Sequence, residues 1–280
     1  MKYAIAVSLV ILCLVITAQQ KTTAQQKNNL RYEILLNNNM LDSSLQKERF
    51  FNALDISPNN LLTLSTGNKI YLLGWGGISQ LGKEIKGTTI SSYAYTKQGL
   101  LMVVKNNILC YMNNNGILDT IVKLPNANMG LAAGKDVMYL FDQIRNDNKY
   151  KLYAFAKKGK YKQLLVSPKP ITTVAEMSDS LYVAIGNGVY SLSPKSNSLN
   201  LVAGFQKESE IRSMTVDSVN NILYIATQKG IYARQNNSLV YVTGDFGGGV
   251  VKYFGEGLII FNPDRNDIIR IVNIDKSIVF

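Results

Sequence analysis

Short runs of alternating hydrophobic and polar residues recur along the chain, each followed by a turn rich in Asn or Gly. Ile211–Asp217 alternates in this way, and the turn at Asn220–Asn221 separates it from the apolar run Leu223–Ala226. A period of two predicts a β-strand, and Asn is common at tight turns because it tolerates a positive φ. Gly188 and Gly230 stand where a third strand starts, and we expect both to supply a positive φ. The pattern predicts antiparallel strands joined by tight turns.

One segment of the chain is repeated. Leu181–Tyr190 and Leu223–Tyr232 share Leu, Tyr, Ala, Gly and Tyr at matching positions. Looser copies begin at Leu62, Leu100, Met138 and Leu258. The copies lie about 40 residues apart and each fits four short strands, which is typical of a β-propeller blade. The units run over 50–88, 89–127, 128–170, 171–209, 210–248 and 249–280. We therefore predict an all-β fold, a β-propeller of about six four-stranded blades.

The last unit is short of one strand. It supplies Val250–Phe254, Leu258–Phe261 and Ile268–Val272, while the strand-like Leu30–Leu36 near the start of the chain has no unit of its own. Closing the ring removes the exposed sheet edges of a propeller, so we predict that the N-terminal strand completes the last blade. Ser277–Phe280 is an alternative closing strand. A β-sandwich or a long meander is the rival fold.

The first residues predict export. A short basic start precedes the apolar run Ala4–Ala18, which is shorter than a membrane span and suits the core of a signal peptide. Cleavage is expected after Ala18 or Ala24, which makes 1–24 the signal peptide and 25–280 a single propeller domain. An uncleaved N-terminal anchor is the alternative. We expect the mature chain in the periplasm, on the cell surface or secreted.

The composition narrows the chemistry. The chain of 280 residues has two Cys and no His, which excludes Ser-His-Asp and Cys-His catalysis and His-ligated zinc or haem. Cys110 is the one thiol left after cleavage, and its apolar neighbours Ile108 and Leu109 predict a buried side chain that is not a nucleophile. We therefore predict no catalytic residue.

The net charge of +11 favours an anionic partner, such as an acidic glycan, lipopolysaccharide, phospholipid headgroups or an acidic protein. A basic surface that only keeps the protein soluble is the alternative. Nucleic acid is not expected for an exported chain, and we expect a monomer.

The unit Met214–Ala226 resembles the blades of bacterial six-bladed propellers of the NHL-repeat, gluconolactonase-like and two-component-sensor kinds. These blades share an apolar residue, Val-Asp, a turn ending in Asn, and an apolar-Tyr-apolar-Ala strand. The resemblance implies the fold, and for gluconolactonase-like members a metal-binding Asn or Glu near the start of the innermost strand. Here the matching positions hold Phe51, Arg212 and Lys252. We therefore predict no metal site and no cofactor, with Ca²⁺ as the one alternative.

The innermost strands of a propeller surround its axis, and the loops that lead into them gather on one face. The candidate ligand-binding residues are those at the strand starts, namely Asn52, Ser92, Asn128, Thr173, Arg212 and Lys252. Two cations among small polar groups suit an anionic ligand or an acidic peptide. In the alternative, Arg212 and Lys252 only pair with Glu210 and Glu256.

These observations predict an exported, non-enzymatic binding module that recognises a protein, peptide or glycan. The alternative function is a Ca²⁺-dependent propeller hydrolase or lyase. That alternative would use carboxylates such as Glu176 and Asp217, which occupy similar places in adjacent units and could approach each other.

Overall fold

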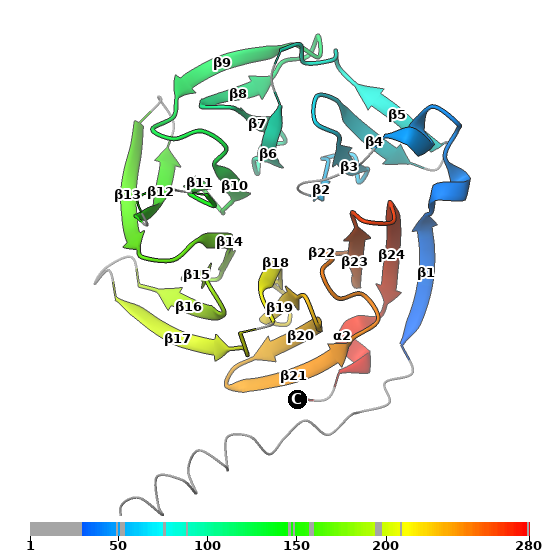
Figure 1. Ribbon diagram of the computed structural model, residues 1–280. Coiled ribbons are helices and arrows are strands. Elements are labelled where there is room, and N and C mark those ends of the chain that lie inside the picture. The colour runs from blue at the N-terminus through cyan, green and yellow to red at the C-terminus, as the bar shows by residue number, and fades with distance from the viewer. Residues whose placement is uncertain are drawn as a thin grey trace, which may run out of the picture.

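Six four-stranded antiparallel sheets stand radially around a central axis, in a computed structural model of the chain (Figure 1). The structure describes residues 30–48, 50, 54–74, 77–87, 89–144, 147, 149–156, 160–193, 198–207, 209–278 and 280. The predicted all-β propeller is confirmed. The predicted signal peptide at 1–24 lies outside the described residues. Among the helices that are described, none is both long and apolar enough to span a membrane.

Each blade follows one repeat of the sequence. The first three blades consist of β2 (Asp55–Ile56), β3 (Leu62–Ser65), β4 (Ile70–Gly74) and β5 (Gly77–Leu81); β6 (Ile90–Tyr95), β7 (Leu101–Lys105), β8 (Ile108–Met112) and β9 (Leu118–Lys123); and β10 (Gly130–Ala133), β11 (Met138–Phe141), β12 (Tyr150–Ala156) and β13 (Lys160–Ser167).

The next two blades consist of β14 (Ile171–Met177), β15 (Ser180–Ile185), β16 (Gly188–Leu192) and β17 (Leu199–Gly204); and β18 (Ile211–Asp217), β19 (Ile222–Thr227), β20 (Gly230–Gln235) and β21 (Ser238–Thr243). Blade 6 contains β22 (Val250–Phe254), β23 (Gly257–Asn262) and β24 (Asp267–Val272) together with β1 (Arg31–Leu36).

The N-terminal strand closes the ring, as predicted. β1 runs antiparallel to β24, with Arg31 opposite Val272 and Leu36 opposite Ile268 (Figure 1). The alternative closing strand at Ser277–Phe280 is wrong, because β1 takes the outer place and Ser277 belongs to the short helix α2 (Ile274–Ser277). Two 3-10 turns, η1 (Asn38–Met40) and η2 (Leu45–Lys47), then lead from β1 towards the first blade.

The chain beyond β1 is also fixed to blade 6. The Asn266 side chain accepts a hydrogen bond from Phe50 N at 3.2 Å and donates one to Glu48 O at 3.0 Å. Glu48 in turn pairs with Lys69 of blade 1 at 2.8 Å. The first and last blades are therefore held together by the outer strand and by the segment that follows it.

The hydrophobic core lies between the blades. Six clusters of buried residues are found among the described residues, one for each pair of neighbouring blades. The middle strand β19 shows the reason, because all six of its residues are buried. Leu223 and Ile225 pack towards blade 4, while Ile222, Tyr224 and Ala226 pack towards blade 6. A strand that is covered on both faces has apolar residues at consecutive positions. This is why the repeat was recognised in the sequence of these strands.

Strand direction separates two faces of the ring. Every innermost strand begins at one face, which we call the upper face, and ends at the opposite, lower face. The links between blades lie at the upper face, because each outer strand ends where the next innermost strand begins. The starts of the innermost strands are therefore gathered around the axis at the upper face.

Candidate functional site

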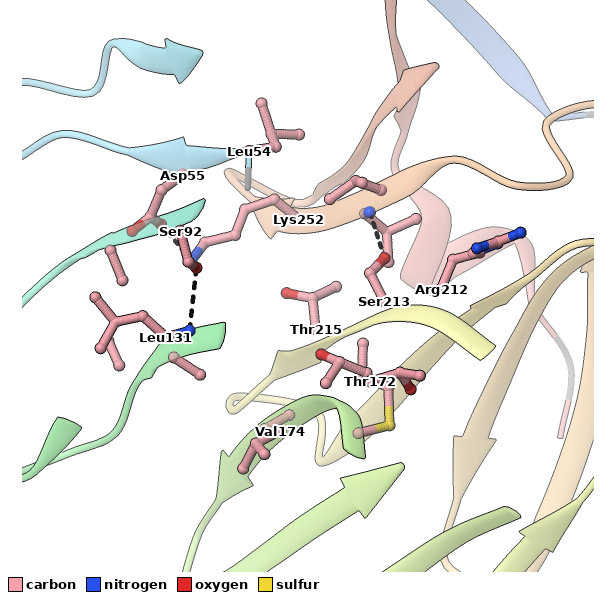
Figure 2. Close-up of a pocket in the computed structure, with 18 of the residues that line it drawn as sticks. Leu54, Asp55, Ser92, Leu131, Thr172, Val174, Arg212, Ser213, Thr215 and Lys252 are labelled. Atoms are coloured by element: carbon pink, nitrogen blue, oxygen red, sulfur yellow. Dashed lines mark hydrogen bonds and ion pairs between the residues drawn. The ribbon is translucent and has the colours of Figure 1, made fainter. Parts of the chain in front are cut away.

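A cavity of about 660 Å³ lies on the axis, and we call it the axial cavity. All six innermost strands contribute to its wall (Figure 2). Gln143 and Pro263, from turns at the upper face, also line it. A volume of this size is in the range of small-molecule pockets and of sites for one or two peptide side chains.

One residue from each blade lies at the same depth in this cavity. Each of these residues pairs with the equivalent residue of the second strand of its blade, as Thr215 pairs with Tyr224 and Lys252 pairs with Ile259. The set, which we call the axial ring, comprises Asp55, Ala94, Ala132, Ala175, Thr215 and Lys252. It is asymmetric, because three consecutive blades contribute Ala while blades 5, 6 and 1 contribute polar or charged side chains.

An ion pair joins the last blade to the first within the axial ring. Lys252 Nζ lies 2.5 Å from Asp55 Oδ1, and Figure 2 shows the lysine side chain extended towards Asp55. Asp55 is 6% exposed, and its oxygens also accept hydrogen bonds from Tyr95 N at 2.8 Å and Ile56 N at 2.9 Å. These three donors use most of the hydrogen-bonding capacity of the buried carboxylate.

Lys252 does not pair with Glu256, so that sequence-based expectation is wrong. Glu256 lies in the turn between β22 and β23 at the lower face, where its carboxylate is 3.9 Å from Lys276. The side chain of Lys252 extends instead towards Asp55 of the neighbouring blade 1 (Figure 2). Its side chain is 35% exposed and lines the axial cavity, so it remains accessible from there.

Arg212 lies at the edge of the cavity and points away from Lys252 and Asp55 (Figure 2). The pairing of β18 with β19 shifts between Ile211 and Ser213, so Arg212 occupies a bulge. Its side chain is 46% exposed, and its guanidinium lies 3.5 Å from the Glu210 carboxylate, as the alternative interpretation of the sequence expected. Of the two predicted cations, Lys252 is the one directed into the axial cavity.

Hydroxyl groups on the innermost strands link neighbouring blades. Ser92 Oγ accepts a hydrogen bond from Leu131 N at 3.0 Å, and Ser213 Oγ accepts the equivalent bond from Val251 N at 2.8 Å. Thr215 Oγ1 accepts one from Tyr253 N at 3.0 Å. In blade 1, Asp55 takes the place of Thr215 and accepts from the equivalent backbone N–H of blade 2.

The predicted site residues are only partly brought together. Ser92, Thr173, Arg212 and Lys252 line the axial cavity. Asn128 is not part of that wall, because it is exposed in the link before β10 with a positive φ of 56°. Asn52 lies outside the described residues. Whether the cavity binds a ligand stays a prediction.

Asp55 was not predicted as a site residue from the sequence. The strand pairings of the structure place Asp55 level with Thr215 and Lys252. The first blade has a two-residue innermost strand, so its alternation was too short to show this alignment.

The two carboxylates considered for catalysis occupy different positions in their blades. Glu176 pairs with Leu181 in the strand register, whereas Asp217 pairs with Ile222, one position further along the repeat. Glu176 accepts hydrogen bonds from the hydroxyl of Tyr139 and from Lys135 N, both at 3.0 Å. Burial and the nearby Glu176 carboxylate raise the pKa of Tyr139, so this phenol stays protonated as a donor.

Asp217 is fully buried at the lower end of β18 and organises the turn that follows. It accepts hydrogen bonds from Val219 N at 3.0 Å and from the Asn220 side chain at 2.7 Å. Both carboxylates therefore have local structural partners. Within the described part of the chain, no group of three or more His, Cys, Asp or Glu side chains is arranged to hold a metal ion.

Comparison with solved structures supports the fold. The chain is similar to the gluconolactonase XC5397 of Xanthomonas campestris, with a TM-score of 0.70, 12% identity, and coverage of 90% of this chain and 93% of that one. It is also similar to the calcium-binding protein regucalcin of Agrobacterium tumefaciens, with a TM-score of 0.63, 9% identity, and coverage of 80% and 90%.

A third similar structure is the extracellular domain of a hybrid two-component system, BT4673, of B. thetaiotaomicron. The TM-score is 0.58 at 11% identity, over 86% of this chain and 39% of that one. No family model matches the sequence, and no curated protein matches it either. The chain is a β-propeller, and the resemblance to gluconolactonase-like and sensor propellers is confirmed at the level of the fold.

Proposed function

We propose that this protein is an exported, non-enzymatic interaction module that holds a protein, peptide or glycan partner at its upper face. The observation that carries the proposal is the axial cavity, an accessible pocket with a polar side, whose carboxylates Asp55 and Glu176 already accept hydrogen bonds from neighbouring groups. Removal of residues 1–24 would deliver the propeller as a single domain outside the cytoplasm. The similarity to an extracellular domain of a two-component system supports an exported binding role.

A Ca²⁺-dependent hydrolase or lyase is the second candidate. The fold similarity to a gluconolactonase and to a calcium-binding regucalcin favours it. The donor set of the axial cavity does not fit, because Ca²⁺ requires six to eight oxygen ligands. Asp55 is the carboxylate of the axial ring, and Lys252 already occupies one of its oxygens at 2.5 Å. A metal at Asp55 would have to displace this ammonium group.

The proposal is tested by capturing a partner on the full chain. A photo-crosslinking amino acid at Thr173, on the wall of the axial cavity, should form a covalent adduct with the partner in extracellular fractions of the source culture. The adduct should be lost in Lys252→Glu and retained in Lys207→Glu, which changes an exposed lysine outside the cavity.

The Lys252→Glu change places an acid beside Asp55, so a second variant keeps the test valid if that one fails to fold. Thr173→Trp, combined with a crosslinker at Ser91, fills the cavity without changing its charge and should also abolish the adduct. Equal crosslinking in every variant would contradict the proposal. A chelator-sensitive rise in melting temperature with Ca²⁺, together with turnover of a lactone, would establish the enzyme alternative instead.

A further inference from the structure

Hydrogen-bond donors outnumber available acceptors on the polar side of the axial cavity. Ser92, Ser213 and Thr215 are each more than nine-tenths buried and line this cavity. Each oxygen accepts a hydrogen bond from a backbone N–H of the next blade. A hydroxyl has one proton to donate as well, and no acceptor for these three protons is found among the described residues.

The charged pair has the same imbalance. The oxygens of Asp55 accept from Lys252, Ile56 N and Tyr95 N, so little of their capacity remains for a ligand. An ammonium group has three protons, and that of Lys252 pairs with Asp55 while the lysine side chain stays partly exposed on the wall of the cavity. A ligand that enters from the upper face therefore meets donors.

The opposite side of the axial ring is formed by three alanines. Blades 2, 3 and 4 present Ala94, Ala132 and Ala175 at the same depth as Lys252. Methyl groups offer no hydrogen bond, so a group resting there must itself be apolar to avoid an uncompensated loss of hydration.

We propose that the axial cavity binds an aliphatic carboxylate carried by a peptide. The carboxylate accepts hydrogen bonds from Lys252 and from the hydroxyls of the innermost strands, and the methylene stem rests against the three alanines. Charge-assisted bonds make a carboxylate a stronger acceptor than an amide or an alcohol. This inference rests on the proposed function, since it names the chemical group by which the partner is recognised.

An acidic sugar fits this wall less well than a peptide does. A uronic acid carries hydroxyl groups around its ring, so some of them would lie against the alanines without a partner. An acidic side chain and a free C-terminus carry the same carboxylate chemistry, and the two sources are separated by the probes below.

The inference is tested with small probes on the full-length propeller, by isothermal calorimetry and by NMR of methyl-labelled alanine. Glutarate should bind saturably, while glutaramide, its neutral counterpart, should bind at least about tenfold more weakly. Acetyl-Gly-Glu-Gly-amide and acetyl-Gly-Gly-Gly with a free C-terminus distinguish the side chain from the chain end. Binding of either peptide supports the proposal, and galacturonate binding more tightly than both would overturn it.

Variants of the ion pair provide the sharper comparison. Lys252→Met should weaken glutarate binding at least about tenfold, and Asp55→Asn should strengthen it, because the competing negative charge is gone while an acceptor for Tyr95 N remains. Lys207→Met is the control and should bind as the wild type does. Asp55→Asn/Lys252→Met removes both charges and serves if Lys252→Met alone fails to fold.

The outcome is separable from that of the proposed function. Glutarate affinity that is unchanged in Lys252→Met and in the double variant overturns the inference, even if the crosslinked partner is still captured. Failure to capture a partner, with intact and Lys252-dependent glutarate binding, counts against the proposed interaction module and leaves the assignment of the ligand group in place.

Discussion

A single buried carboxylate joins three blades at the centre of the ring. Asp55 belongs to blade 1, pairs with Lys252 of blade 6 and accepts a hydrogen bond from Tyr95 N of blade 2. The equivalent position in blade 5 is Thr215, which makes the same bond to its neighbour with a neutral hydroxyl. Asp55 therefore combines the ordinary link between blades with the ion pair across the junction of the first and last blades.

Replacing Asp55 by Ala should reduce the free energy of unfolding by about 2–4 kcal/mol, because it leaves Lys252 and the Tyr95 N–H without their acceptor. Asp55→Thr introduces the residue that blade 5 has at this position, and it should recover part of the lost free energy of unfolding. Urea unfolding followed by circular dichroism measures both. The control is Asp179→Ala at an exposed turn of the lower face, which should change stability by less than about 0.5 kcal/mol. Equal free energies of unfolding for Asp55→Ala and Asp55→Thr would show that a hydrogen-bond acceptor at position 55 does not contribute to stability.

Backbone conformations of single residues were predicted correctly from the sequence where the turn itself determines them. The turn residues Asn60 and Asn221 have the positive φ expected of them, and so does Gly230. Gly188 was predicted wrongly, because the positive φ falls at Gly186. The requirement at Gly188 is space, since a Cβ there would lie 2.8 Å from the ring of Tyr190. Tyr190 lies two residues further along the same strand, so the contact depends on the orientation of its ring, which the hydrophobic pattern does not predict.

At the scale of elements, the outer strand of blade 6 was predictable because the last repeat had three strands and the N-terminal strand had no repeat of its own. The residues of β1 also show which side of that strand contributes to stability. Leu36 is 4% exposed and packs in the cluster between blades 6 and 1, whereas Ile34 is 62% exposed. A register shift between these two residues turns the last part of the strand into the core.

Leu36→Ala should therefore cost about 2–4 kcal/mol of stability, through the lost apolar contacts and the cavity left behind. Ile34→Ala on the same strand should stay within about 0.5 kcal/mol of the wild type. Chemical unfolding of the two variants side by side compares them. A larger loss for Ile34→Ala would mean that the outer face of β1 is covered by something, such as a partner or another part of the chain.

The candidate site was harder to predict than the elements, for a reason of geometry. A repeat period locates strands to within a residue or two, but a shift of one residue turns a side chain from the axis into a blade interface. Ser92 and Lys252 were identified although they lie at different depths of the axis. Asp55 becomes visible only when the strand pairings of all six blades are aligned.

At the scale of the whole molecule, the closed ring gives every blade two neighbours. In an open array of repeats the end units have one interface each and can unfold separately. Here β1 and the pair of Asp55 with Lys252 connect blade 6 to blade 1, and a buried cluster fills that junction as it fills the other five. Loss of any single interface therefore opens a ring whose remaining blades have become an open array.

The ring should accordingly unfold in one cooperative transition. In calorimetry, the van't Hoff and calorimetric enthalpies of the wild type should agree. Leu36→Ala at the junction and Leu152→Ala in the cluster between blades 3 and 4 should each lower the same single transition by several degrees. The two junctions lie on different sectors of the ring, so a separate early transition in Leu36→Ala alone would show that blade 6 opens independently. An equal fall of the melting temperature in both variants would mean that the closing junction is as strong as an ordinary blade interface. The physical reason is that the ion pair at the axis and the N-terminal strand at the rim act on the same pair of blades.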